Sequence, residues 1–244
     1  MMTVHLIRTE LRLLAREPLT LIVSLAFPIL LLMLLAASFG TGSDADLGGL
    51  SGADFYAPVY LSATIAVMGL MGVPTHVAGY RERGVLRRFR AAGVTSRGLV
   101  LSQIALTVTL ALVGAVLMVG LGRAVFDLRF PMSWIGTLVS FLVGAVAFAA
   151  FGMLLGVLLS TARAAQGLGL ALFFGLFFVS GGGPPPALLP DALNTFAGYT
   201  PMGWVINAVS DPWHGASWNP GALALLATMA VLSILLATRR LTRT

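Results

Sequence analysis

Long apolar segments that alternate with short polar ones dominate the pattern of this chain. A helix that crosses a bilayer needs about 20 mostly apolar residues at a rise of ~1.5 Å per residue. We therefore predict an all-α integral membrane protein, a single transmembrane domain with six transmembrane helices. The six predicted spans are residues 19–39, 55–78, 99–121, 133–159, 167–179 and 221–237.

The composition favours the same class. Hydrophobic residues make up 58% of the chain and charged residues 10%, whereas a soluble domain is about half apolar and a quarter charged. The chain has no cysteine, and His5, His76 and His214 lack metal partners at ligand spacing. Hydrolase motifs and phosphate-binding glycine loops are also absent from the sequence. These features argue against a membrane-embedded enzyme and predict no metal or cofactor in this chain.

The segment between the second and third predicted spans, residues 79–100, carries six of the fifteen arginines. Its larger apolar residues, Val85, Leu86 and Phe89, have the i, i+1, i+4 spacing of one helical face. We interpret residues 81–92 as a short amphipathic helix on the cytoplasmic membrane surface. A solvated basic loop is the alternative, but it would explain the charge without explaining the ordered apolar face.

Charge is distributed unevenly between the two sides of this plan. With the N-terminus inside, the cytoplasmic segments hold thirteen arginines and three acids, a net charge of +10. The external segments hold Arg123, Arg129 and six aspartates, a net charge of −4. Arginine-rich loops stay on the cytoplasmic side, so this asymmetry predicts both termini in the cytoplasm. It also accounts for the overall charge of +6 without nucleic-acid binding.

The first residues of the chain have a second amphipathic pattern. In residues 3–17, three arginines recur at a spacing of four along one helical face, opposite a row of leucine and isoleucine. This pattern predicts an interfacial helix that lies flat on the membrane. A secretory signal peptide is disfavoured, because the segment holds two acids and the following apolar run is too long. The three arginines are Arg8, Arg12 and Arg16.

Residues 188–210 are too often interrupted by proline to form a span. Pro190 can open one short helix, and Thr200 followed by Pro201 is a favourable N-cap and first residue for another. Trp204 suits the headgroup level of a bilayer. We interpret the segment as two re-entrant half-helices that dip into the outer leaflet and pack on protein. An ordinary external loop with aromatic anchors remains the alternative.

No Asp, Glu, Lys or Arg lies in the middle of a predicted span. Ion-coupled carriers usually need such groups as proton relays or ion ligands. A transporter without an internal ion site or a nucleotide site must be driven by another chain. The basic amphipathic helix is the natural place for that chain to act.

Three features, in order along the chain, resemble the ABC-2 type permeases, the membrane subunits of bacterial ABC exporters. The flat N-terminal helix before a span with Pro28 is similar to the family's connecting helix. Arg81–Val94 resembles the E-R/K-x-G-T-L-x-x-L-x-A-T-P-V pattern of the family's loop between spans two and three. Leu189–Leu193 followed by Thr200-Pro201 is similar to its L-P-x-x-L … N-P segment.

The basic segment departs from the family pattern at four points. Its E-R-G is one residue shorter, Val85 replaces threonine, Phe89 replaces leucine and Gly93 replaces proline. The resemblance nevertheless covers nearly the whole chain.

The resemblance implies a bacterial plasma-membrane permease that pairs with a second copy or a sister permease. Each copy would bind a separate ABC ATPase subunit that carries the ATP and Mg²⁺. Val85, Leu86 and Phe89 would be buried in a groove of the ATPase, while arginines beside them would meet acids or lipid phosphates. The residues expected to couple the two subunits are Arg81, Glu82, Arg83, Gly84, Val85, Leu86, Arg87, Arg88, Phe89 and Arg90.

The substrate expected from this resemblance is hydrophobic or amphiphilic, as in the compact drug exporters of the daunorubicin-resistance kind. Spans one, two and five line the dimer interface in this family. A lipid-linked glycan exporter and a non-transporting membrane scaffold or assembly factor remain alternatives. The candidate pathway residues are Phe27, Met68, Met71, Phe173, Phe174, Phe177 and Phe178, the last four of which are predicted to form one aromatic face.

Overall fold

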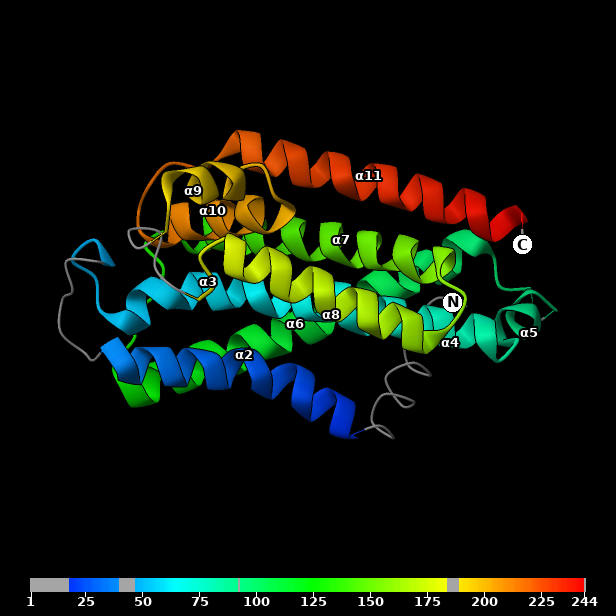
Figure 1. The fold of residues 1–244 in the computed structure, drawn as a ribbon, viewed down its shortest axis with the longest axis horizontal. Helices are drawn as coiled ribbons and strands as arrows, with labels where there is room; N and C mark the ends of the chain where they lie inside the picture. The colour runs from blue at the N-terminus through cyan, green and yellow to red at the C-terminus, as the bar shows by residue number, and fades with distance from the viewer. Residues whose placement is uncertain (1–17, 40–46, 92, 184–188, 244) are drawn as a thin grey trace.

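The computed structural model describes residues 18–39, 47–91, 93–183 and 189–243, which form helices joined by short connections (Figure 1). These ranges contain no β-strand, which confirms the all-α prediction. The predicted interfacial helix, residues 3–17 with Arg8, Arg12 and Arg16, lies outside the described residues.

Five helices of the described part are long and apolar enough to cross a membrane, so the chain is a multi-pass membrane protein. The first is continuous from Gly52 to Glu82 and contains α3, a π-helical turn named η2, and α4. A further apolar helix, α2, precedes it, and three short helices lie near the ends of the bundle. The bounds are α2 Pro18–Phe39, α3 Gly52–Val67, η2 Met68–Gly72, α4 Val73–Glu82, α5 Val85–Ala91, α6 Ser96–Phe126, α7 Trp134–Leu158, α8 Ala162–Val179, α9 Asp191–Ala197, α10 Pro201–Trp213 and α11 Pro220–Arg243.

Two of these helices differ from the expected spans in a way that matters for the site. The helix Gly52–Glu82 extends beyond the predicted span 55–78 at both ends. Helix α8 begins at Ala162, where a turn was expected to continue to residue 166. The Thr161 hydroxyl accepts a hydrogen bond from the Ala164 N–H at 3.2 Å. This side-chain cap starts the helix early and shortens the α7–α8 connection to three residues, 159–161.

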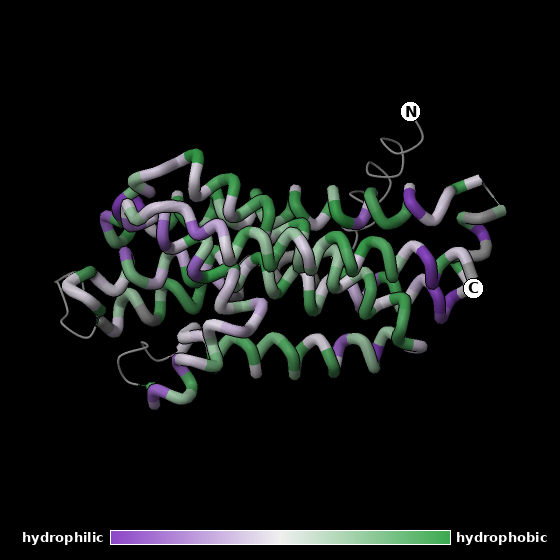
Figure 2. Tube along the Cα trace, turned by 90° about the horizontal axis from the view of Figure 1, so that it is seen from above, coloured by the Kyte–Doolittle hydropathy of each residue, from purple (hydrophilic) through white to green (hydrophobic). Residues whose placement is uncertain are grey.

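The long helices run along a common axis, with their polar residues gathered mainly at two ends (Figure 2). One end holds α5, the α7–α8 turn and the C-terminus of α11 (Figure 1). The opposite end holds α9, α10 and the start of α3. We call them the basic end and the aspartate end, from the residues they carry. These are Arg81, Arg83, Arg88, Arg97, Arg163, Arg239 and Arg240 at the first, and Asp54, Asp127, Asp191 and Asp211 at the second.

A buried carboxylate joins two connections at the aspartate end. Asp54 is only 6% exposed, and it accepts hydrogen bonds from the Arg129 backbone N–H and the Ser51 hydroxyl, each at 2.9 Å. Ser51 is also the N-cap of α3, because its hydroxyl accepts from the Asp54 N–H. Asp54 therefore belongs to the first turn of α3, which begins three residues before the predicted span 55–78.

Close backbone contact sets the packing of the bundle. The π-turn Met68–Gly72 lies against Gly152 of α7 and Gly169 of α8. A Cβ atom on Gly152 would lie 1.9 Å from the Gly69 carbonyl oxygen, and one on Gly169 would lie 2.1 Å from that of Leu70. No side chain fits at either glycine, so both helices meet the π-turn backbone to backbone. Small residues permit such approach in membrane bundles, where Cα–H···O contacts add to the attraction.

Replacing Gly152 with alanine should therefore destabilise the fold. We expect Gly152→Ala to lower the free energy of unfolding by about 1–3 kcal/mol, because the added methyl group must push α7 away from the π-turn. Tryptophan fluorescence during heating in detergent measures this change. Gly175→Ala is the matched control, since nothing lies within 4 Å of its added Cβ atom. Equal unfolding temperatures for Gly152→Ala and Gly175→Ala would contradict the packing argument.

Candidate functional site at the basic end

Two glycines define the short helix α5. Gly84 has φ +69° and Gly93 has φ +80°, a backbone region that residues with side chains rarely adopt. The first turns the chain out of α4, and the second ends α5 with a hydrogen bond from the Val94 N–H to the Phe89 carbonyl at 2.9 Å. The helix thus covers only Val85–Ala91, within the predicted 81–92. Arg81 and Glu82 belong instead to the end of the long helix before it.

The apolar face of α5 packs on the permease itself. Leu86 and Phe89 are half-buried and contact a cluster that includes Leu99 of α6 and Leu241 of α11. The Phe89 ring also meets Tyr80 of α4 edge-on, with ring centroids 5.8 Å apart. Leu86 and Phe89, for which the resemblance implies a groove of the ATPase, attach α5 to its own bundle in this structure. A short apolar face buries against the nearest apolar surface, and the ends of α4, α6 and α11 supply one.

The remaining surface of α5 is basic. Arg88 is exposed, and Val85 is half-buried. Just before the helix, Arg83 is exposed and its Nε donates to the Gly79 carbonyl at 3.3 Å. The side chains of Arg87 and Arg90 lie outside the described residues. The described part of this surface therefore offers positive charge, with little apolar area, to whatever approaches the basic end.

Arg81 binds the C-terminal end of α7. Its Nη1 donates to the Val157 carbonyl at 2.9 Å and to the Leu159 carbonyl at 3.4 Å. The last carbonyls of a helix have no partner within the helix, and they carry the negative end of its dipole. The Arg81 guanidinium donates hydrogen bonds to these carbonyls and also places a positive charge at the negative end of the α7 dipole.

Glu82 binds the start of α8 in the complementary way. Its Oε2 accepts a hydrogen bond from the Ala162 N–H at 3.0 Å, at the positive end of the α8 dipole. Arg81 and Glu82, which are adjacent in α4, thus bind the C-terminal end of α7 and the N-terminal end of α8. In each case the charge of the side chain is opposite to that of the dipole end it contacts. Both side chains are exposed, so each contact contributes about 0.3–1 kcal/mol. We call this pair the Arg81–Glu82 anchor, and it links the end of α4 to both helices of the α7–α8 turn.

The anchor could not be found from sequence. Glu82 stood out as an isolated acid among arginines, but no spacing rule relates it to a turn eighty residues later.

The expected aromatic face of α8 divides into two stacked pairs. Phe173 and Phe177 stack at 5.3 Å between ring centroids and are buried, and Phe177 lies 5.8 Å from the ring of Tyr60. Phe174 and Phe178 stack at 5.9 Å, and Phe178 is 52% exposed. Side chains four residues apart share a helical face, so each i, i+4 pair takes its own direction.

Three of the candidate pathway residues are buried in the described bundle. Phe173, Phe177 and Met68 are 1%, 2% and 5% exposed, so they fill the interior of the described bundle and line no surface. Met71 is half-buried, and the side chain of Phe27 lies outside the described residues. Among the described candidates, Met71 and Phe174 are half-buried and Phe178 is exposed, so these three keep surface that a partner or a solute could contact.

The segment before the last span contains two short helices, α9 and α10, whose junction is held by side-chain caps. The Thr200 hydroxyl accepts from the Gly203 N–H at 2.9 Å, and Pro201 is the first residue of α10. Trp204 donates from Nε1 to the Gly198 carbonyl at 3.0 Å. Pro190 is the residue before α9. These contacts hold the α9–α10 junction, and α10 itself packs against α3 and α7.

Among the residues described, no group of three His, Asp or Glu side chains has the arrangement of a metal site. We take the basic end as the candidate functional site, because exposed arginines, α5 and the Arg81–Glu82 anchor meet there.

The family model described as "ABC-2 family transporter protein" matches residues 48–239, a range that holds the helix Gly52–Glu82, α5 and the anchor. This chain belongs to the ABC-2 transporter family. The match confirms the resemblance inferred from the sequence. Members of this family are membrane components of ABC transporters, so this permease is expected to associate with an ABC ATPase. No curated protein matches the chain.

Removing the anchor should loosen the α7–α8 turn of the permease. In Arg81→Gln and Glu82→Gln, we expect amides of residues 157–165 to exchange hydrogen about two- to five-fold faster, which corresponds to a loss of about 0.3–1 kcal/mol. Hydrogen exchange followed by mass spectrometry measures this rate. Arg239→Gln removes an exposed arginine elsewhere at the basic end and should leave these amides unchanged. Unaltered exchange in both anchor variants would show that the contacts do not hold the turn.

Proposed function

We propose that this permease is the membrane subunit of an ATP-driven exporter whose ABC ATPase acts on the basic end. The observation that carries this proposal is the Arg81–Glu82 anchor together with the packing of α5. The exposed surface of α5 is basic, while its other face is attached to α4, α6 and α11. A displacement of α5 by the ATPase is therefore transmitted directly to the end of α4, and through the Arg81–Glu82 anchor to α7 and α8.

In this proposal the basic end lies in the cytoplasm, because arginine-rich segments remain on that side of a bacterial plasma membrane. Helix α2 is then the first of six spans, and both termini are cytoplasmic. The helices α9 and α10 lie at the external end and re-enter the outer leaflet. ATP and Mg²⁺ bind to the partner ATPase.

The proposed assembly contains two permease copies, or one copy and a sister permease, and two ATPase subunits. The outer aromatic pair, Phe174 and Phe178, supports a contact at the dimer interface or with the solute. The absence of charge within the spans favours a hydrophobic or amphiphilic substrate, such as a drug, an antibiotic or a lipid. It disfavours a sugar polymer, which needs hydrogen-bonding groups along its path.

The coupling proposal predicts a selective loss of transport in anchor variants. The permease and its ABC ATPase are reconstituted together in vesicles that contain a hydrophobic dye. We expect the double variant Arg81→Gln, Glu82→Gln to lower ATP-driven dye movement and stimulated hydrolysis at least about ten-fold, within the usual range of coupling between sites. The two subunits should still co-purify, because the basic surface of α5 is unchanged.

Arg239→Gln again serves as the control and should retain transport. Full transport by the double variant would contradict the coupling role of the anchor. A parent protein that binds the ATPase but moves no hydrophobic compound on ATP hydrolysis would favour the scaffold alternative.

The proposed orientation can be tested with single cysteines, since the chain has none of its own. Arg88→Cys lies at the basic end and Ser217→Cys at the aspartate end, and both positions are exposed. A membrane-impermeant maleimide should label Arg88→Cys only in inside-out vesicles and Ser217→Cys only in right-side-out vesicles. The reverse pattern would overturn the cytoplasmic placement of the basic end.

A further inference from the structure

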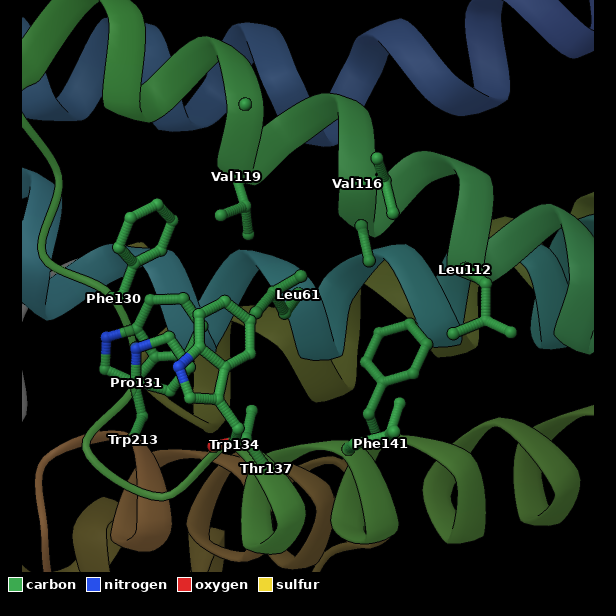
Figure 3. A pocket seen from close by; sticks show the side chains of 13 residues that line it. Leu61, Leu112, Val116, Val119, Phe130, Pro131, Trp134, Thr137, Phe141 and Trp213 are labelled. Atoms are coloured by element: carbon green, nitrogen blue, oxygen red, sulfur yellow. The ribbon is translucent and has the colours of Figure 1, made fainter.

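A cavity of about 370 Å³ lies among α3, α6, α7 and α10, toward the aspartate end (Figure 3). Its walls are mostly aliphatic, and four aromatic residues, Phe130, Trp134, Phe141 and Trp213, contribute to them. Several wall residues are also exposed on the outer surface of the bundle, among them Val116 at 71% and Trp134 at 59%. The cavity is therefore open to the surroundings of the bundle between α6 and α7.

One polar group in the wall has no partner. Thr137 of α7 is 7% exposed, and its Oγ1 makes no hydrogen bond to any described residue. A buried hydroxyl without a partner is unfavourable, especially at membrane depth where water is scarce. Most buried side-chain hydroxyls in the spans avoid this by donating to a carbonyl of their own helix, as Thr64 does to Tyr60 at 2.9 Å. An occupant with an acceptor oxygen would satisfy Thr137 after a rotation of the Thr137 side chain, because Oγ1 is covered by protein in the present arrangement.

Two arginines flank the mouth of the cavity, at the end where the aspartates gather. The Arg123 guanidinium carbon lies 5.6 Å from the centroid of the Phe130 ring, which lines the cavity. Arg129 precedes Phe130 in the chain, and its side chain is 79% exposed. Arg123 pairs with Asp127 at 2.6 Å, and Arg129 meets Asp54 through Nε at 3.6 Å. Because the Arg129–Asp54 contact is the longer of the two and the Arg129 side chain is exposed, that side chain is accessible to an external anion.

We propose that this cavity holds an acyl chain of a phospholipid from the leaflet at the aspartate end. The chain lies against the apolar walls, an ester carbonyl accepts a hydrogen bond from Thr137, and the phosphate lies near Arg129. The positions of Trp134 and Thr137 along α7 agree with this arrangement of acyl chain, ester and phosphate. Thr137 is three residues, about 4.5 Å, further along α7 than Trp134, the first residue of the helix. Tryptophan typically lies at the headgroup level, so Thr137 lies near the ester level.

The shape and chemistry of the cavity favour a lipid chain over other occupants. Ligand pockets span about 300–1,000 Å³, so a cavity of about 370 Å³ has room for a flexible acyl chain. Apart from Thr137 and the indole N–H groups of Trp134 and Trp213, the side chains of the walls are apolar, so a polypeptide backbone in the cavity would lack partners for most of its polar groups. The surrounding bilayer supplies acyl chains at very high local concentration. This inference does not depend on which end of the permease is cytoplasmic.

Brominated phospholipids, which quench nearby tryptophans, test the occupant directly. The protein is reduced to one reporter by Trp134→Phe, Trp204→Phe and Trp218→Phe, which leaves Trp213, a cavity residue that is only 4% exposed. We expect phospholipids brominated on the acyl chain to quench Trp213 by half or more relative to unbrominated vesicles. In this background, Ala115→Phe places a ring in the cavity and should remove most of the quenching.

Ala227→Phe is the matched control, because Ala227 is an exposed residue of α11 outside the cavity. It should leave the quenching unchanged. Thr137→Val keeps the shape of the side chain but removes the hydroxyl, and it should raise the fraction of brominated lipid needed for half-quenching about two-fold or more. The parent protein supplies a second measurement without substitutions, since a phospholipid with a diazirine in its acyl chain should label residues 112–119 or 137–141.

Unquenched Trp213, or quenching that Ala115→Phe leaves intact, would overturn the proposal. So would diazirine labelling confined to other segments. If a brominated soluble amphiphile quenched Trp213 and brominated phospholipid did not, the cavity would be assigned to a transported compound. That result would also overturn the proposal.

Discussion

The bundle depends on the contact between the π-turn Met68–Gly72 and two facing glycines. Gly152 and Gly169 let the backbones of α7 and α8 approach the carbonyls of Gly69 and Leu70 so closely that no Cβ atom would fit. In a bilayer, helices gain little from leaving an apolar solvent, so close packing must hold them together. This contact places the helix Gly52–Glu82 at the centre of the fold.

The same three helices meet again at the basic end, where the contacts are electrostatic. The Arg81–Glu82 anchor joins the end of α4 to the α7–α8 turn, which lies between the two helices that contact the π-turn. The helix Gly52–Glu82 is thus fixed to α7 and α8 at two levels along its length. In the proposed mechanism, a displacement of α5 would pass to α7 and α8 through both levels of contact. The anchor contacts are weak and exposed, whereas the glycine contacts are tight.

Some features of this structure were predictable from the sequence and others were not. The apolar runs identified the helical membrane architecture, and the Thr200-Pro201 pair marked the start of α10, because capping depends on adjacent residues. The spacing of Phe173, Phe174, Phe177 and Phe178 indicated a shared face, but only packing decided that one pair faces Tyr60 and the other the surface. Likewise, the apolar face of α5 was evident from its spacing, whereas the surface that covers it was not.

The sequence by itself determined which segments are apolar enough for a membrane, where the positive charge lies, and to which family the chain belongs. These properties depend on neighbouring residues or on short motifs in a fixed order. The tertiary structure alone decided that Arg81 and Glu82 bind helix ends 76 to 80 residues away, that a π-turn contacts two glycines, and that Thr137 lines a cavity. Such contacts join residues distant in the chain, so only the folded packing of the helices creates them.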